Sequence, residues 1–236
     1  MRIGSASYRC KNGDPAFNLQ SVERAMKEAQ GKAELLCFGE SFLQGFDALC
    51  WDFSIDREIA VSRDSETIRT IREWTKQYGV GLLLGYIERD GERLYSSCIV
   101  IDNGEILHNY RRISKGWKEF DRTDEHYCEG TETGGFAFRG RRFMLSLCGD
   151  LWDFPERFQS EDPLIWPVWV CYSEEDWETE ELSAYAAHAA TVARDTLMIN
   201  PLAPDTDCIG GAFRLHNGTV AERIPFGAEG ILYTDI

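Results

Sequence analysis

Apolar and polar positions along the chain fall into blocks whose period switches between that of a strand and that of a helix. A strand-like run over residues 2–8 is followed by a helical pattern over 18–30 and by an apolar run over 34–38. Apolar residues that recur every three or four positions lie on one face of a helix. A second helical pattern covers 63–78. This alternation of strands and helices is typical of parallel strand pairing.

The rest of the chain reads mainly as short strands separated by turn residues. Further strands are expected at 80–87, 94–101, 106–113, 136–138, 142–147, 164–171, 196–200, 210–215, 220–223 and 230–233, and a third helix at about 178–194. Turns such as Asn103-Gly104 join neighbouring strands into antiparallel hairpins. About a dozen strands are too many for one open sheet. The pattern therefore predicts an α/β fold with two packed mixed sheets, helices outside, and a single domain over 1–236.

Charge and cysteine usage narrow the class of protein. The 236 residues include 40 acidic and 25 basic side chains, a net charge of −15. Such a chain repels phosphate backbones, so nucleic acid is not expected as a partner. No apolar run reaches the roughly 20 residues of a membrane span, so we expect a cytoplasmic protein without a membrane partner. The eight cysteines show no zinc-site spacing, which predicts reduced thiols and no metal.

Two apolar runs end abruptly at residues that carry chemistry. The run Phe143–Leu147 ends at Cys148, which a glycine and an aspartate follow. The run that begins at Leu35 ends in the same way at Glu40. A carboxylate beside a thiol at strand ends places a general base next to a nucleophile. We therefore expect Glu40 and Cys148 to be catalytic.

Histidine is the usual base for a catalytic cysteine, and it gives an alternative. Of the four histidines, only His126 lies in a loop that could reach the thiol. A Cys-His hydrolase or acyltransferase that uses His126 therefore stays open as a second enzymatic interpretation.

The chain resembles the nitrilase, or carbon-nitrogen hydrolase, superfamily, as an amidase-like member. The resemblance runs in order through Phe38-Gly39-Glu40, Cys148-Gly149-Asp150 with Pro155-Glu156, Ile199-Asn200 and Gly210-Gly211. It implies a four-layer α-β-β-α sandwich and hydrolysis of a non-peptide C–N bond by Glu-Lys-Cys chemistry through a thioester. It also implies a small-molecule amide-type substrate, no cofactor, and a homodimer or higher homo-oligomer.

The family's lysine is missing from its usual register. The family pattern Tyr-Arg-Lys reads here as Tyr110-Arg111-Arg112, so Arg112 takes the place of the lysine. In an extended segment alternate residues share a face, which places Lys118 with Arg112 and points Lys115 away. The expected order for the cation is therefore Lys118, then Lys115, then Arg112 alone.

Three further residues complete the expected site. Many family members carry a second glutamate, and Glu125 is the best match to it. The backbone N–H of Gly149, the residue after the cysteine, is expected to help hold the oxyanion, and Trp152 is a candidate for the pocket wall. The displaced lysine also motivates a different class of function, a catalytically silent nitrilase fold that serves in binding or scaffolding.

Overall fold

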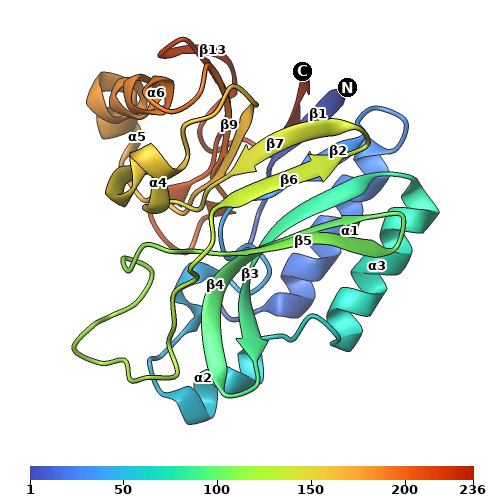
Figure 1. The fold of residues 1–236 in the computed structure, drawn as a ribbon, viewed down its shortest axis with the longest axis vertical. Helices are drawn as coiled ribbons and strands as arrows, with labels where there is room; N and C mark the ends of the chain where they lie inside the picture. Colours follow the sequence, from blue (N-terminus) through green and yellow to red (C-terminus); the bar gives the residue numbers. More distant parts are fainter.

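The computed structural model describes residues 1–236 and contains two six-stranded mixed sheets that pack face to face (Figure 1). The first sheet has the order β14-β1-β2-β3-β4-β5. Its three central strands are parallel and the others antiparallel. The bounds of its strands are β1 Arg2–Ser7, β2 Leu35–Cys37, β3 Gly81–Asp90, β4 Arg93–Asp102, β5 Glu105–Arg111 and β14 Gly230–Asp235.

The second sheet repeats this plan, with the order β13-β12-β9-β8-β7-β6 and parallel pairing of β7, β8 and β9. The bounds of its strands are β6 Gly134–Phe138, β7 Arg141–Leu145, β8 Leu164–Pro167, β9 Asp195–Ile199, β12 Ala212–His216 and β13 Thr219–Ile224. A separate two-stranded ribbon joins β10 Leu202–Ala203 to β11 Cys208–Ile209.

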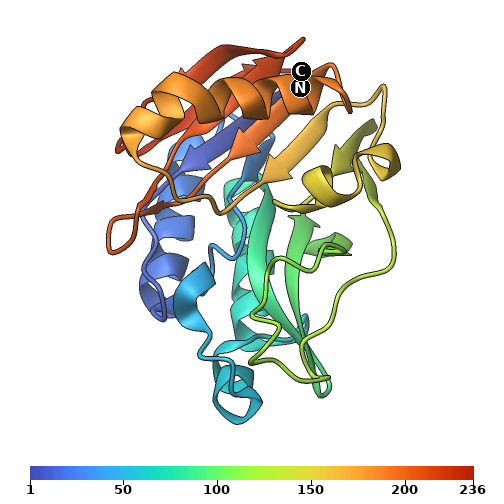
Figure 2. The same ribbon diagram turned by 90° about the vertical axis from the view of Figure 1, so that its left-hand side faces the viewer.

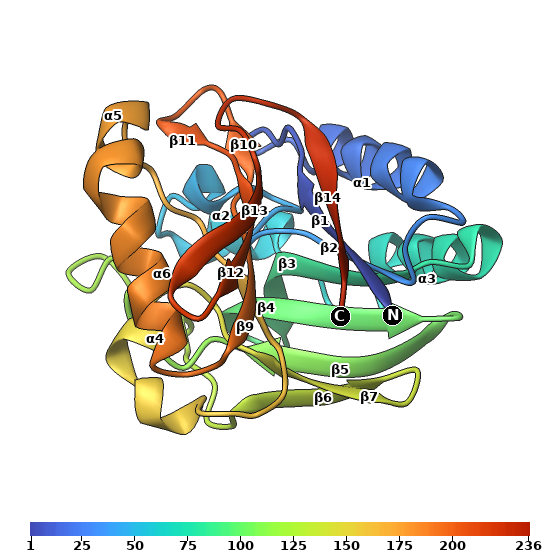
Figure 3. The same cartoon turned by 90° about the horizontal axis from the view of Figure 1, so that it is seen from above.

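Helices cover the outer face of each sheet (Figure 3). On the first sheet, α1 (Pro15–Ala29) and α3 (Glu66–Tyr78) begin at Asp14 and Ser65, whose side chains accept backbone N–H groups of the first turn. This capping satisfies donors that a helix N-terminus leaves unpaired. No helix is long and apolar enough to span a bilayer.

On the second sheet lies one continuous helix built from α5 (Glu174–Asp176), a π-helical turn (Trp177–Glu181) and α6 (Leu182–Ala190). Figure 2 shows this helix, in orange, lying across the strands of the second sheet. The four layers confirm the predicted α-β-β-α sandwich.

The differences from the expected elements lie around the strand ends. The short helices α2 (Phe53–Ile59) and α4 (Asp150–Asp153) were not expected. The strand expected over 164–171 stops at Pro167, because the chain leaves the second sheet there. The carbonyl of Val168, the next residue, accepts the backbone N–H of Glu40, which follows β2. This bond ties together the ends of the two sheets at which the chemistry-bearing residues lie.

Candidate active site

Cys148 lies on a sharp turn between β7 and α4. Its φ of +41° is in the left-handed region, which is uncommon for a residue with a β-carbon. Its backbone N–H donates to the Pro167 carbonyl at 2.9 Å, and its own carbonyl accepts from Trp166 Nε1 at 2.9 Å. These bonds hold the strained turn in place. A conformation of this kind, held by its surroundings, is a feature of functional sites.

Glu40 is fully buried, and its two carboxylate oxygens have different environments. Oε1 accepts from Ser96 Oγ at 2.7 Å and from Arg112 Nη1 at 2.9 Å. Oε2 is buried and has no hydrogen-bond partner. A buried carboxylate oxygen without a hydrogen-bond partner destabilises the folded protein, and such exceptions often have a functional reason. The free oxygen is available to a group that enters or reacts beside it.

Arg112 follows β5 directly and turns its guanidinium towards Glu40. Nη1 forms the ion pair with Glu40, and Nε donates to Ser114 Oγ at 2.7 Å. Nη2 has no partner in the protein and lies beside Gly149: a β-carbon at position 149 would be 2.5 Å from it. Burial lowers the pKa of Arg112, but the negative charges around it, Glu40 first among them, outweigh burial and raise the pKa above its ordinary value. The cation therefore stays charged.

The thiol of Cys148 lies near the Glu40 carboxylate, whose charge acts on it, and Sγ donates to the Trp169 carbonyl at 3.8 Å. Burial, followed by the charge of Glu40, raises the pKa of Cys148 to about 12, while the nearby Arg112 opposes the rise. At neutral pH the resting site therefore holds Cys148 as a neutral thiol. Such a thiol attacks only when the base accepts its proton.

Asp150 connects the nucleophile turn to the segment that carries Arg112. Its Oδ1 accepts the backbone N–H groups of Ile113 and Ser114 at 3.0 and 2.7 Å. Its Oδ2 accepts the N–H of Leu147 at 3.0 Å and the hydroxyl of Tyr110 at 2.6 Å. Four donors on one buried carboxylate hold both segments in a fixed relation.

The two lysines lie outside this cluster. Lys118 Nζ contacts the Tyr127 carbonyl and the Glu129 carboxylate, the latter at 2.7 Å, and Lys115 is exposed. The alternation used to place Lys118 requires an extended chain, but β5 ends at Arg111 and the backbone bends from Ser114 onward. The position beside Glu40 and Cys148 is filled by Arg112.

The remaining predicted residues take different places. Glu125 is exposed on the loop between β5 and β6. The N–H of Gly149 has no acceptor in the protein, and Arg112 Nη2 lies beside the same residue. Trp152 is 42 % exposed and stacks on His188 with ring centres 3.9 Å apart, so it packs towards the outer helix. His126 stacks on Phe53 at 3.8 Å, and its Nδ1 faces Asp124.

Ser96, Ser114 and Asp150 touch the cluster, although the sequence did not single them out for a role. The sequence feature that could have identified Ser96 is the polar pair Ser96-Ser97 inside an apolar strand. A polar side chain buried in a sheet needs a hydrogen-bond partner, so such a pair points to polar groups packed against the strand. No group of three or more His, Cys, Asp or Glu side chains is arranged to hold a metal ion.

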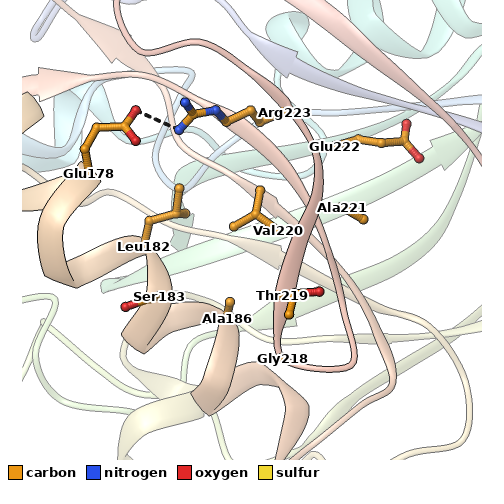
Figure 4. Close-up of a pocket in the computed structure, with 10 residues that line it drawn as sticks. All are labelled: Glu178, Leu182, Ser183, Ala186, Gly218, Thr219, Val220, Ala221, Glu222 and Arg223. Atoms are coloured by element: carbon orange, nitrogen blue, oxygen red, sulfur yellow. Dashed lines mark hydrogen bonds and ion pairs between the residues drawn. The ribbon is translucent and has the colours of Figure 1, made fainter.

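A surface hollow of about 600 Å³ lies elsewhere, between α6 and β13 (Figure 4). Its charged side chains include the ion pair of Glu178 with Arg223 at 2.7 Å. The hydroxyls of Ser183 and Thr219 donate to backbone carbonyls of their own turns. The hollow therefore lacks the unpartnered groups that distinguish the cluster around Cys148, and we assign the candidate active site to that cluster.

Comparison with known proteins agrees with this geometry. The carbon-nitrogen hydrolase family matches residues 2–156. An (R)-stereoselective amidase of Pseudomonas sp. is 27 % identical over 156 residues, covering 66 % of this chain and 54 % of the amidase. A nitrilase of Talaromyces marneffei is 24 % identical and covers 92 % of this chain and 80 % of the nitrilase. The chain spans about half the length of the Pseudomonas amidase and about a quarter of a glutamine-dependent NAD(+) synthetase of Thermotoga maritima.

Solved structures share the fold. A CN-hydrolase superfamily protein of Xanthomonas campestris superposes with a TM-score of 0.80 at 18 % identity, covering 99 % of this chain and 89 % of that one. A mutant amidase of Nesterenkonia sp. superposes with a TM-score of 0.78 at 19 % identity, covering 100 % and 93 %. The matched family covers well over half of the chain, and the protein belongs to the carbon-nitrogen hydrolase family.

Proposed function

We propose that this protein hydrolyses a small amide-type substrate at a C–N bond, with Cys148 as nucleophile and Glu40 as general acid and base. One observation carries the proposal: Glu40 has one oxygen saturated by two donors and one buried oxygen without a partner, and its charge acts on the nearby thiol of Cys148. An enzyme base needs a free lone pair aimed at the proton it takes.

In the acylation step, Oε2 of Glu40 accepts the thiol proton while Cys148 Sγ bonds to the amide carbon. The electron pair of the carbonyl moves to its oxygen, which accepts hydrogen bonds from Arg112 Nη2 and the Gly149 N–H. Both donors lack protein partners, as donors reserved for a developing charge should. The C–N bond then breaks, Glu40 returns the proton to the leaving nitrogen, and a thioester remains on Cys148.

In the deacylation step, Glu40 takes a proton from water, and the hydroxide attacks the thioester carbonyl. The same two donors stabilise the second oxyanion. The C–S bond breaks, the thiolate recovers its proton from Glu40, and a carboxylic acid leaves. Arg112 contributes charge throughout and no proton, because a guanidinium does not deprotonate in proteins. All proton transfers therefore pass through Glu40.

The test is direct trapping of the acyl-enzyme. The protein is incubated with a panel of small aliphatic and aromatic amides and nitriles, and released ammonia and acid are quantified. Intact-protein mass spectrometry on rapidly quenched samples should show an acyl adduct that maps to Cys148. The adduct should be absent in Cys148→Ala and unchanged in Cys171→Ser, which removes an exposed thiol outside the cluster.

Absence of both turnover and adduct across the panel, in folded protein, would favour a catalytically silent binding protein. The same proposal includes a homo-oligomer, which light scattering of the purified protein would test.

A further inference from the structure

The guanidinium of Arg112 is held at two of its three nitrogens. Nη1 is fixed by Glu40 and Nε by Ser114, whose side chain is fully buried. A guanidinium is planar, so two anchored nitrogens determine the position of the third. The third, Nη2, lies over Gly149, directly after the nucleophile. With only the bond to Glu40, the guanidinium plane could rotate about that contact.

The space occupied by Nη2 exists because two neighbouring residues are glycines. A β-carbon at position 149 would lie 2.5 Å from Nη2, a distance that real β-carbons do not show. A β-carbon at position 116 would lie 3.3 Å from the same nitrogen. Gly149 has φ −65°, so its backbone does not require glycine. The requirement at position 149 comes from the arginine.

We propose that Ser114 is a positioning residue and that Arg112, Ser114 and Gly149 form one adapted unit, in which Ser114 aims Nη2 at the reacting carbonyl. The inference rests on the proposed function, since Nη2 has a task only if an oxyanion forms beside Cys148. It predicts that lysine is the wrong side chain for this site. A lysine at position 112 has a single nitrogen: it can reach Glu40, but it leaves Ser114 without its donor and the space over Gly149 empty.

The decisive experiment is a double-mutant cycle at positions 112 and 114. Turnover of an amide that the substrate panel identifies is measured for four proteins: wild type, Ser114→Ala, Arg112→Lys and the double variant. We expect Ser114→Ala to lower kcat by about tenfold to a hundredfold with little change in KM, because a misaimed oxyanion donor acts in the transition state. We expect Arg112→Lys to lower kcat as well, rather than to restore a missing lysine.

The coupling between the two substitutions in kcat shows whether Ser114 positions Arg112 or only supports the fold. A lysine side chain has no Nε–H for Ser114 to accept, so Ser114→Ala should cost little further in the Arg112→Lys background. A merely structural serine would cost the same in both backgrounds. Ser97→Ala is the matched control, since Ser97 is a buried serine of β4 that donates to Glu88, outside the active site. It should leave kcat unchanged.

Equal losses from Ser114→Ala in the two backgrounds, or an Arg112→Lys variant at least as active as wild type, would overturn the inference. Failure of the proposed function looks different, because wild type itself would then show no turnover. In that case the cycle is repeated on the pH dependence of Cys148 alkylation by iodoacetamide. Ser114→Ala should slow the alkylation of Cys148 between pH 8 and pH 10 only when Arg112 is present, and an unchanged rate would overturn the inference.

Discussion

Two Glu-Arg pairs with buried carboxylates lie on opposite faces of the same sheet, and their arginines are adjacent in the sequence. Arg111 and Arg112 point to opposite faces at the end of β5, where Arg111 pairs with Glu88 at 2.8 Å and Arg112 with Glu40 at 2.9 Å. Both glutamates are fully buried. The two pairs therefore share a sheet, a residue type and a degree of carboxylate burial, and they differ in how completely they are satisfied.

On the helix-covered face, every carboxylate oxygen of Glu88 is occupied. Arg111 donates to both oxygens, Ser97 and Asn109 donate to Oε2, and Arg63 lies 3.2 Å from Oε1. Burial raises the pKa of Glu88, but these donors outweigh it and hold the pKa below its ordinary value. The carboxylate is locked in its charged form and has no capacity left for another proton donor.

On the face between the sheets, Ser96 donates to Glu40 as Ser97 does to Glu88, but Glu40 has only one further donor, Arg112. Glu40 keeps one bare oxygen and Arg112 one bare nitrogen, and Cys148 lies beside both. Under the proposed function, Glu88-Arg111 is a structural pair and Glu40-Arg112 the reactive one. The reactive pair is then the one left incomplete, because unpartnered groups in a dry site are the ones that can respond to a substrate.

The largest difference in activity is expected between the variants Glu40→Gln and Glu88→Gln. The first substitution keeps shape and removes the base, so kcat/KM should fall by about 10²- to 10⁴-fold. The second removes a carboxylate that touches no reacting atom and should leave kcat/KM close to wild type. Initial-rate kinetics on the amide substrate measure both. Comparable losses in the two variants would mean that the pairs do not differ in function.

Stability should rank the same two variants in the opposite order. Glu88→Gln leaves Arg111 and Arg63 beside an uncharged amide, and breaking a buried pair costs roughly 3–5 kcal/mol. Both arginines are partly exposed, which favours the lower end of that range. Glu40→Gln should cost less, because Glu40 has fewer partners and one unsatisfied oxygen. Urea denaturation at pH 7 gives both values.

The pH dependence follows from the lowered pKa of Glu88. Its stabilisation is present above the ordinary carboxyl pKa of 4.5 and is lost as the pH falls through the lower folded value. The stability gap between wild type and Glu88→Gln should therefore narrow in acid. A gap that stays constant from pH 7 to pH 3 would contradict the role assigned to these donors.

The two strand ends that carry Glu40 and Cys148 were visible in the sequence, because an apolar run that stops at a polar residue marks both a strand and its end. The four layers were predictable for the same reason, since periodicity sets which face of each element is buried. The cation was not predictable in this way. From Ser114 onward the chain bends and turns, so alternation carries no information about Lys118.

Burial of the serines depends on strand register, which pairs Ser97 with Arg111 and brings the backbone N–H of Arg112 to the Ser96 carbonyl. Register between β4 and β5 is a tertiary property, and a shift of one residue would exchange the two faces. The sequence therefore shows the components of both pairs without showing which serine serves which glutamate.

Asp150→Asn tests whether the reactive pair depends on its clamp. The asparagine carbonyl can still accept from Ile113 and Ser114, but its NH₂ then faces the N–H of Leu147, donor against donor, while the Tyr110 hydroxyl can turn to accept from it. The segment carrying Arg112 should shift against the nucleophile turn, and a displacement near 1 Å can cost about a hundredfold in rate. Steady-state kinetics should show the loss mainly in kcat.

Tyr110→Phe is the matched partner, because it removes one of the four donors and creates no clash. It should lose much less activity than Asp150→Asn. Equal losses would indicate that the tyrosine hydroxyl, rather than the clamp as a whole, is what matters.

The smallest predicted effect is a shift in the titration of Cys148. In wild type, burial and the charge of Glu40 raise the pKa of this thiol to about 12, and Arg112 opposes them. Glu40→Gln removes one of the raising charges and frees Arg112 from its partner, so the pKa of Cys148 should fall. An opposite charge that is no longer neutralised lowers such a pKa by about 1–3 units.

Alkylation by iodoacetamide, followed by site-resolved mass spectrometry across pH 6–11, measures this shift. The rate for wild type should still be rising at pH 11, whereas the Glu40→Gln variant should reach its half-maximal rate within this range, although it has lost turnover. Glu88→Gln should titrate like wild type, because its carboxylate lies on the other face of the sheet. A variant that is both inactive and harder to alkylate would show that Glu40 activates the thiol in the resting enzyme. The lower midpoint expected here instead separates two effects of one carboxylate: it suppresses the free thiolate at rest and accepts the proton when substrate arrives.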